Sequence, residues 1–370
     1  MNFIYKYTTI LVLALITISC GKEQSVVQEK TFESDESKML YAFIEKSGDL
    51  INSQEAPFLI MADEVMENKA QYLVIDLRDT SEYEAGHIDG AVLVDAKDLL
   101  NYLENKANSS VYEKVVLACH TGQTSSYYTT LLRLIGYNNV FSLKFGMSGW
   151  SKKIQPNKIV DNLSDKYTAS LEIKANVPDK QYQAPKIETG KKGGYQIMTD
   201  RVKTIAGEGF NAARIKIDTL MINPSRYFIV NYWPSDHYDK GHLPGSFMME
   251  PKNSLMKDKM LKYLPTDKEI VVYCLNGQNS ASVVAWLRVL GYNAKSLSLG
   301  ANGFMHNFAA SFDEKAFLPS RDIADYELVE GKNPGLINIV PVSSTSAPTT
   351  EKETKAPVIK KKQKSSGGGC

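Results

Sequence analysis

The chain carries the segment Val116-Leu117-Ala118-Cys119-His120-Thr121-Gly122-Gln123-Thr124-Ser125, in which a cysteine directly follows a short apolar run. The run at 115–118 has the length and composition of a buried parallel strand. From Ser125 to Ile135 the spacing is helical, and Gly136 is a suitable stop for a helix. The segment therefore predicts a strand, a tight loop that contains Gly122, and a helix that begins at once.

The same pattern returns 155 residues later, as Val272-Tyr273-Cys274-Leu275-Asn276-Gly277-Gln278-Asn279-Ser280. A second motif, Tyr-x-x-Gly-His-x-x-Gly, starts at Tyr83 and again at Tyr238, in the same register. Chance does not keep several such blocks in one register. We infer a tandem repeat, and 370 residues suit two domains of ordinary size with additional segments.

Each repeat alternates expected strands with expected helices. The apolar runs predict strands at 72–75, 115–118 and 140–143, and again at 228–230, 270–273 and 295–299. Helices are predicted at 125–135 and 280–290. This alternation indicates an α/β fold with two domains, each a mostly parallel sheet with helices on both faces.

Shifts in composition set the expected boundaries of the domains. We expect a signal peptide at 1–19, a lipidated N-terminus and tether at 20–40, domain 1 at 41–157, a linker at 158–195, domain 2 at 196–315 and a low-complexity Lys/Gly tail at 316–370. The linker is polar and contains several prolines, and the tail runs from Ser/Thr/Pro into lysines and glycines. Such compositions are typical of connecting and disordered segments.

The N-terminus has the pattern of a secretory signal. Lys6 precedes an apolar run from Tyr7 to Ile18, which ends at Ser19 and Cys20. The segment 15–21 resembles a bacterial lipobox, which implies lipidation of Cys20, attachment to a membrane through that lipid, and a place in the cell envelope. The alternative is an ordinary cleaved signal in which Cys20 has no special role.

Charge and cysteine usage exclude several classes of function. The formal net charge is +1, so nothing electrostatic argues for a nucleic-acid partner. The four cysteines lie far apart and form no CxxC pair, which leaves zinc and thioredoxin-like sites without support. His87 and His242, in the two Gly-His turns, are expected to order these turns rather than to bind a metal, since no second ligand lies at ligand spacing.

The predicted loop is suited to chemistry at sulfur. A parallel strand delivers the cysteine to the carboxyl end of the sheet, where open α/β proteins place their ligands. Backbone amides of the loop and the N-terminus of the following helix favour a thiolate, which is the nucleophilic form. Gly122 and Gly277 allow the backbone to turn close to a ligand, and Ser125 and Ser280 are suited as helix N-caps or as donors to the site.

These motifs together resemble the rhodanese family. The resemblance rests on Asp76-x-Arg78, the Glu82-to-Ala91 segment, the Cys119-to-Ser125 loop and the closing Gly146-x-x-Gly149-Trp150, and it covers about 60–160 and 200–310. It implies a sulfurtransferase without a metal or an organic cofactor. A small sulfur-containing donor, such as thiosulfate or a persulfide, would load a cysteine, and a thiol, cyanide or a protein would accept the sulfur.

The resemblance also implies roles for individual residues. Cys119 would be the nucleophile, and Cys274 would be a second one. The residues that follow each cysteine would form its sulfur-binding loop. These are His120, Thr121, Gly122, Gln123, Thr124 and Ser125 in domain 1, and Leu275, Asn276, Gly277, Gln278, Asn279 and Ser280 in domain 2. Asp76, Arg78, Glu82 and His87 resemble the residues that support the fold of this family.

Departures from the family pattern keep other functions open. Thr124 and Asn279 stand where many single-domain members carry arginine, and Asn231 and Trp233 replace Asp76 and Arg78 in the second repeat. A non-catalytic binding or sulfur-carrier module is therefore the main alternative. A phosphatase fits less well, because the short loop has no arginine to hold phosphate. Cys370 is expected to belong to a plain tail, with a mobile sulfur acceptor as the alternative.

Overall fold

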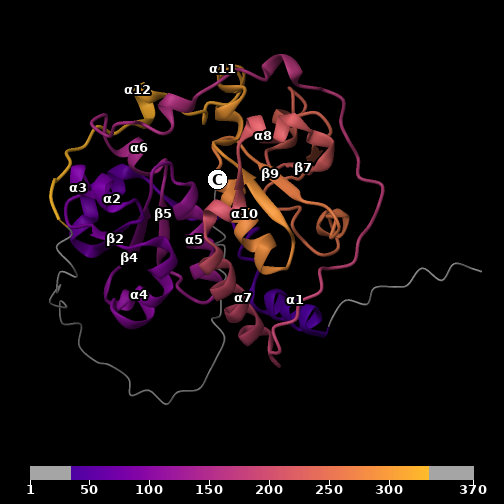
Figure 1. Ribbon diagram of the computed structural model, residues 1–370, viewed down its shortest axis with the longest axis horizontal. Helices are drawn as coiled ribbons and strands as arrows, with labels where there is room; N and C mark the ends of the chain where they lie inside the picture. The colour runs from indigo at the N-terminus through magenta and orange to yellow at the C-terminus, as the bar shows by residue number, and fades with distance from the viewer. Residues whose placement is uncertain (1–34, 333–370) are drawn as a thin grey trace, which may run out of the picture. The chain divides into compact units, whose positions relative to one another are not determined.

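The computed structural model describes residues 35–332 and contains two five-stranded sheets of the same strand order (Figure 1). The order is β1-β5-β4-β2-β3 in the first sheet and β6-β10-β9-β7-β8 in the second. All neighbouring strands in both sheets run parallel. The prediction of two α/β domains with parallel sheets is thus confirmed.

Domain 1 contains five strands and the helices that cover them. Its strands are β1 (Leu59–Ile60), β2 (Tyr72–Asp76), β3 (Val92–Leu93), β4 (Lys114–Ala118) and β5 (Val140–Leu143). Its helices are α2 (Ala62–Asn68), α3 (Thr80–Ala85), α4 (Leu99–Asn105), α5 (Gln123–Leu134) and α6 (Gly146–Trp150).

Domain 2 repeats the order of the strands, but α7 precedes its first strand and a 3-10 helix (Leu261–Tyr263) stands where domain 1 has α4. Its strands are β6 (Arg214–Ile215), β7 (Phe228–Asn231), β8 (Phe247–Met248), β9 (Ile270–Tyr273) and β10 (Ala294–Leu297). Its helices are α7 (Gly194–Glu208), α8 (Ile217–Ile222), α9 (Ser235–Tyr238), α10 (Gln278–Val289) and α11 (His306–Ala310).

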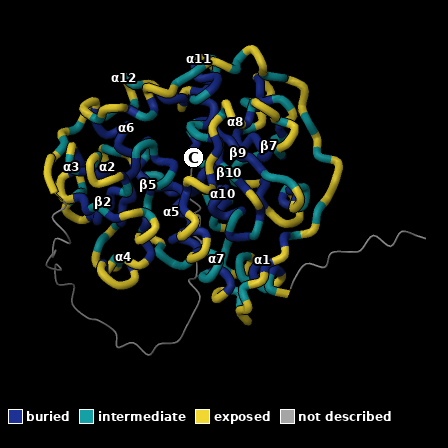
Figure 2. Tube along the Cα trace, in the orientation of Figure 1, coloured by how far each residue is buried: buried dark blue, intermediate teal, exposed yellow. Residues whose placement is uncertain are grey.

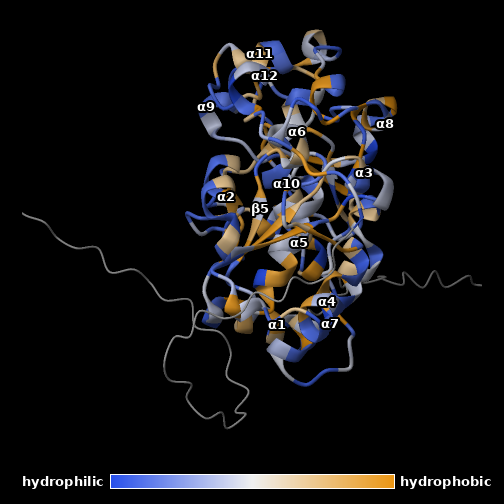
Figure 3. Cartoon of the chain, turned by 90° about the vertical axis from the view of Figure 1, so that its left-hand side faces the viewer, coloured by the Kyte–Doolittle hydropathy of each residue, from blue (hydrophilic) through white to orange (hydrophobic). Residues whose placement is uncertain are grey.

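Alternate residues of the central strands enter different hydrophobic clusters. In β2, Leu73 and Ile75 join a cluster with α5, whereas Val74 joins a second cluster with Met147 and Trp150 of α6. Both faces of the sheet are therefore covered, which explains why this strand reads as a continuous apolar run. In Figure 3 the hydrophobic colour gathers around β5 and α5, and much of α2 and α9 is hydrophilic.

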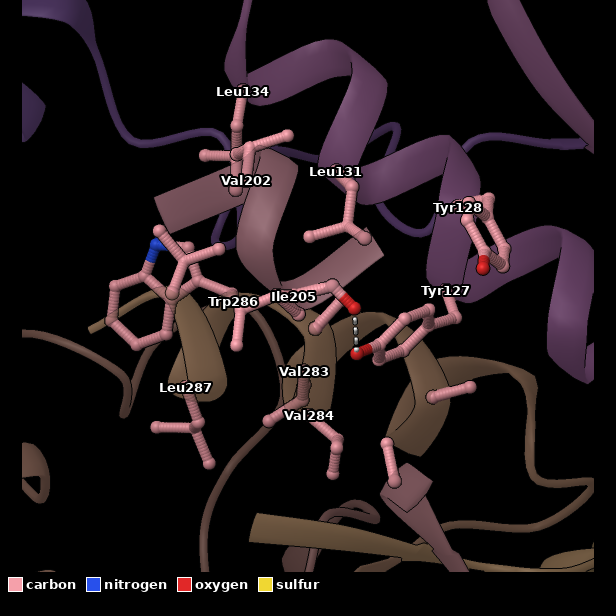
Figure 4. Packing of buried hydrophobic residues seen from close by; sticks show 14 of the residues in the cluster. Tyr127, Tyr128, Leu131, Leu134, Val202, Ile205, Val283, Val284, Trp286 and Leu287 are labelled. Atoms are coloured by element: carbon pink, nitrogen blue, oxygen red, sulfur yellow. Dashed lines mark hydrogen bonds between the residues drawn. The ribbon is translucent and has the colours of Figure 1, made fainter. Parts of the chain in front are cut away.

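Helices α5, α7 and α10 form the interface between the domains. Leu131 of α5, Ile205 of α7 and Val284 of α10 belong to one cluster of buried residues that extends into both sheets (Figure 4). Tyr127 donates a hydrogen bond to the carbonyl oxygen of Ile205 (3.5 Å), and Thr130 Oγ1 lies 2.6 Å from Ser282 Oγ. The two domains therefore share one core, and α5 and α10 are buried along most of their length (Figure 2).

Three expected boundaries differ from the observed packing. The expected tether at 20–40 includes the start of helix α1 (Asp35–Ser47), because Leu40 is buried and Ser37 Oγ donates to the carbonyl oxygen of Pro185 (2.6 Å). Helix α1 packs against α7 of domain 2. The expected linker contains two short 3-10 helices, Val160–Asn162 and Thr168–Ser170, and part of it packs on the core of domain 2.

The expected tail is also partly ordered. Residues 316–332 carry helix α12 (Pro319–Asp322) and run back over domain 1 (Figure 1). Phe317 packs edge-on against Phe145, and Tyr326 N–H donates to the carbonyl oxygen of Trp150 (2.9 Å). Apolar side chains therefore anchor this stretch, where a low-complexity tail was expected to begin at 316.

The predictions for the remaining ends lie outside the described residues. These are the signal peptide, Cys20 and Cys370. None of the helices between residues 35 and 332 combines the length and the apolar character that crossing a membrane requires.

Candidate functional site

The Cys119 loop connects β4 directly to α5. Its sulfur accepts the Ser125 N–H (3.4 Å) and lies 3.5 Å from Ser125 Oγ. Gly122 is left-handed (φ 81°) and is the N-cap of α5, so the helix begins two residues earlier than the sequence predicted. Ser125 is therefore not the cap; its hydroxyl donates to the carbonyl oxygen of Gly122 (2.9 Å). The loop brings one backbone N–H and the start of the helix to the sulfur.

A turn after β5 holds the loop from the other side. Met147 N–H donates to the carbonyl oxygen of Cys119 (2.7 Å), and Ser148 N–H donates to that of His120 (2.9 Å). Gly146 makes this approach possible, because a Cβ atom at this position would lie 2.2 Å from the Cys119 carbonyl oxygen. The turn thus fixes the backbone of the residue that carries the sulfur.

Gly146→Ala is expected to destabilise the protein much more than Gly90→Ala, measured by urea-induced unfolding. Both glycines are left-handed, with φ of 57° and 81°, but a Cβ at Gly90 would meet nothing within 4 Å. The strained conformation alone costs about 1 kcal/mol, and the clash at Gly146 adds roughly 1–3 kcal/mol. Equal losses in the two variants would contradict the close approach of this turn to the Cys119 loop.

The Cys274 loop of domain 2 has the same geometry. Ser280 N–H lies 3.3 Å from the sulfur and Ser280 Oγ 3.6 Å from it. Gly300 takes the place of Gly146, and Ala301 N–H donates to the carbonyl oxygen of Cys274 (2.9 Å). The side chains of both cysteines are buried, with 4% exposure for Cys119 and 2% for Cys274.

Two serines that contact the hydroxyl groups next to the sulfurs were not predicted from the sequence. Ser142 Oγ of β5 lies 2.7 Å from Ser125 Oγ, and Ser296 Oγ of β10 lies 2.8 Å from Ser280 Oγ. Each is a polar residue in a buried strand, and a second copy 154 positions away was the available signal. These serines fix the hydroxyl groups that contact the cysteines.

A pocket of about 170 Å³ opens beside the loop of domain 1. Arg78, Glu82, His120, Lys153, Lys158 and Leu328 are among the residues that line it. Lys158 was not predicted as a site residue, and the sequence around it carries no signal for this place. Arg78 pairs with Asp76 and Lys153 pairs with Glu327 (2.5 Å), which leaves Lys158 as the lining cation with no ion pair among the described residues. Lys158 can attract an anion to this pocket.

His120 and Glu82 face each other in this pocket, with 2.8 Å between His120 Nε2 and Glu82 Oε1. Burial, together with the nearby Arg78 and Lys158, lowers the pKa of His120 to about 4. Burial also raises the pKa of Glu82. The imidazole is therefore neutral at pH 7 and donates its Nε2–H to the carboxylate, so it adds no positive charge to the loop.

Asp76 and Arg78 form a buried ion pair behind the pocket. Arg78 Nη2 lies 2.7 Å from Asp76 Oδ2 and also donates to the carbonyl oxygen of Gly86 (2.7 Å). His87 stacks on Tyr83 at 3.8 Å and bonds to the Tyr83 carbonyl oxygen through Nδ1 (2.8 Å). This arrangement ties the end of β2 to the turn at 86–87.

Domain 2 replaces the ion pair by hydrogen bonds from neutral side chains, one of which ends on the buried carboxyl group of Asp313. Asn231 Nδ2 donates to the hydroxyl oxygen of Tyr273 (2.7 Å), and Trp233 Nε1 donates to Asp313 Oδ2 (2.9 Å). Tyr273 stands where domain 1 has Ala118, so its ring occupies space at the end of the strand. His242 keeps the turn contact, with Nδ1 2.9 Å from the carbonyl oxygen of Tyr238.

The remaining loop residues take different positions. Thr121, Thr124, Asn276 and Asn279 are half-buried, and Leu275 is buried where domain 1 has His120. Gln123 and Gln278 point across the interface to the other domain, as the hydrogen bonds to Leu299 and Phe145 show. Within residues 35–332, no three His, Cys, Asp or Glu side chains come together in a group that could hold a metal ion.

Fold and site thus define a tandem α/β protein that carries a buried cysteine in a strand-to-helix loop of each domain. A family model described as the rhodanese-like domain matches residues 61–153 and 220–307, and the chain belongs to the rhodanese family.

Individual relatives match over parts of the chain. Thiosulfate sulfurtransferase GlpE of Pseudomonas fluorescens is 32% identical over 78 residues, which make up 21% of this chain and 69% of that protein. Probable adenylyltransferase/sulfurtransferase MoeZ of Mycobacterium tuberculosis is 33% identical over 87 residues, 24% of this chain and only 22% of that protein. The crystal structure of SseA, a 3-mercaptopyruvate sulfotransferase from Escherichia coli, is 18% identical, covers 65% of this chain and 97% of its own, and has a TM-score of 0.24.

Proposed function

We propose that the protein moves sulfane sulfur from a donor to a thiophilic acceptor through a persulfide on Cys119. The observation that carries the proposal is the position of the Cys119 sulfur, which accepts the Ser125 N–H at the start of α5. A backbone donor and a helix N-terminus stabilise negative charge on sulfur, both in the thiolate and in the persulfide. Rhodanese-like domains and sulfurtransferase relatives support a general role in sulfur transfer or sulfur carriage.

The reaction has two displacement steps. In the first, the Cys119 thiolate attacks the outer sulfur of a donor such as thiosulfate; a new S–S bond forms, and the old bond breaks with its electron pair on the leaving sulfite. In the second, cyanide, a thiolate or a protein acceptor attacks the terminal sulfur, and the electron pair of the broken bond returns to Cys119. Both steps need a nucleophile that is also a good leaving group, which a stabilised thiolate is.

We assign the reaction to domain 1 in the first place. The pocket next to His120 offers Lys158 to an anionic donor, whereas in domain 2 Leu275 and Trp233 stand at the positions of His120 and Arg78. Cationic side chains concentrate an anionic sulfur compound near the loop. We therefore expect Cys274 to react more slowly than Cys119 with such donors.

Mass spectrometry of the intact protein after incubation with thiosulfate, polysulfide or mercaptopyruvate tests the proposal. The expected result is the gain of one sulfur atom, located by peptide mapping to the loop at 119–125 and removed again by cyanide. If neither cysteine takes up sulfur from any of the three donors, the sulfurtransferase proposal is wrong.

The burial of Cys119 supports a second candidate, a sulfur-carrier or binding module. A side chain with 4% exposure protects a persulfide from small nucleophiles. A carrier would load once and release sulfur to a specific protein only. Repeated turnover of thiosulfate and cyanide to thiocyanate by the full-length protein would exclude this candidate.

We further propose that lipid on Cys20 holds the protein in the cell envelope, on the strength of the lipobox-like segment 15–21. Expression of the full-length chain in a bacterial host tests this by membrane fractionation. The wild type is expected in the membrane fraction and Cys20→Ser in the fraction without membranes. An unchanged distribution of the variant would contradict lipid attachment at this residue.

A further inference from the structure

The two cysteine loops meet across the domain interface through a pair of glutamines. Gln123 follows the loop glycine of domain 1, and Gln278 follows that of domain 2. A Cβ atom at Gly122 would lie 2.2 Å from Gln278 Nε2, and one at Gly277 would lie 2.6 Å from Gln123 Oε1. Each glycine therefore makes room for the glutamine of the other domain.

Gln278 is fully buried and contacts both segments that shape the Cys119 loop. Its Oε1 accepts the N–H of Phe145 (2.9 Å), the residue directly before Gly146. Its Nε2 lies within hydrogen-bond distance of the carbonyl oxygen of Gly122 (3.3 Å) and of Ser126 Oγ (3.3 Å). A single side chain of domain 2 thus joins the start of α5 to the turn that holds the Cys119 backbone.

The contacts in the opposite direction are fewer. Gln123 Oε1 accepts the N–H of Leu299 (3.0 Å), which precedes Gly300 in domain 2. Its Nε2 donates to Thr121 Oγ1 (2.8 Å) within its own loop. Domain 2 therefore supports the loop of domain 1 through more hydrogen bonds than it receives.

The backbone conformation of Phe145 explains why the hydrogen bond to Gln278 matters. Its backbone is left-handed (φ 63°), a conformation that a residue with a side chain adopts only when its surroundings enforce it. The hydrogen bond from Phe145 N–H to Gln278 is part of that enforcement. Without it, the turn at 145–148 would relax and move the two N–H groups that hold the Cys119 and His120 carbonyl oxygens.

We propose that Gln278 is a positioning residue for the reaction at Cys119, so that domain 2 is required for the activity of domain 1 even when Cys274 does not react. The proposal rests on the proposed sulfur transfer at Cys119. It assigns domain 2 a role that does not depend on its own cysteine.

Single-turnover loading of the full-length protein with thiosulfate, followed by mass spectrometry of the 119–125 peptide, tests the role of Gln278. Gln278→Met keeps the length of the side chain and removes all its hydrogen bonds. The expected result is at least a tenfold slower loading of Cys119 with the same final fraction loaded. The donor concentration for half-maximal rate should change less than threefold, because Arg78 and Lys158 are untouched.

The comparison of rate and final fraction separates positioning from a folding defect. A partly unfolded variant would load a smaller fraction at the wild-type rate, and this result would overturn the proposal. Thr130→Val is the matched control, because it removes another buried contact between α5 and α10 without touching the loop; its rate should stay within twofold of wild type.

Two further outcomes are distinguishable. If the wild type loads and Gln278→Met loads equally fast, the positioning role is wrong and the sulfurtransferase proposal stands. If the wild type does not load at all, the proposed function itself fails. Gln278→Asn keeps the amide but is too short to reach Phe145; it should show the same slow loading and replaces the methionine variant if that one does not fold.

Discussion

Cys119→Ser is expected to lose thiosulfate:cyanide sulfurtransferase activity by a factor on the order of a thousand or more. Serine fits the loop, since the Ser125 N–H can donate to its oxygen as it does to sulfur. It cannot form a persulfide, and its hydroxyl is a far weaker nucleophile than a thiolate. The measurement is the initial rate of thiocyanate formation by the full-length protein.

Cys274→Ser is the matched control for this experiment. The two loops share their geometry, so the substitution is structurally equivalent in domain 2. We expect less than about a threefold loss, because the pocket that Lys158 lines lies beside the loop of Cys119. If Cys274→Ser is inactive and Cys119→Ser remains active, the reaction takes place in domain 2 and the assignment to domain 1 is wrong.

Asp76→Ala is expected to destabilise the protein by about 3–5 kcal/mol, because it leaves the guanidinium of Arg78 buried without its partner. Both side chains are almost fully buried, and Arg78 Nη2 lies 2.7 Å from the carboxylate. The free energy of unfolding in urea or guanidinium chloride measures the effect.

Asp89→Ala is the control, since it breaks an exposed ion pair in the same domain. Asp89 Oδ2 lies 2.6 Å from Lys69 Nζ, and both groups reach solvent. Exposed pairs contribute about 0–1 kcal/mol, so this variant should unfold close to the wild type. A loss at Asp76 as small as that at Asp89 would show that the buried pair does not support domain 1.

Much of the fold follows from local pattern in the sequence. The central strands are buried on both faces, which makes them mostly apolar with several β-branched residues, and the repeat gives a second copy of each pattern. The sequence also predicts that each of the two cysteines lies at the end of a strand, directly before a helix. These features depend on neighbours along the chain or on the register of the repeat, both of which are visible in one sequence.

The parts that escaped prediction depend on contacts between distant segments. Gln278 looked like a residue of its own loop, and nothing local indicates that its amide reaches Phe145, 133 positions away. Lys158 enters the pocket from a segment that reads as a linker. The charge and periodicity of the sequence around such a side chain do not indicate which distant segment it contacts.

The changes in domain 2 are also clear only in three dimensions. The sequence shows Asn231 and Trp233 as separate departures from domain 1. In the structure Asn231 bonds to Tyr273, and Trp233 bonds to Asp313. Two separate hydrogen bonds therefore stand in place of the Asp76–Arg78 pair, and the second ends on the buried carboxyl group of Asp313.

Each end of the described chain packs on the domain that is farther away along the sequence. Helix α1 comes before domain 1 yet packs on α7 of domain 2, whereas residues 316–332 come after domain 2 yet pack on domain 1. A tension applied to either terminus would therefore act first on the domain farther away along the chain. Both ends of the described chain thus add to the contacts of α5, α7 and α10 between the domains, so we expect the two pieces to stay associated after a cut in the linker.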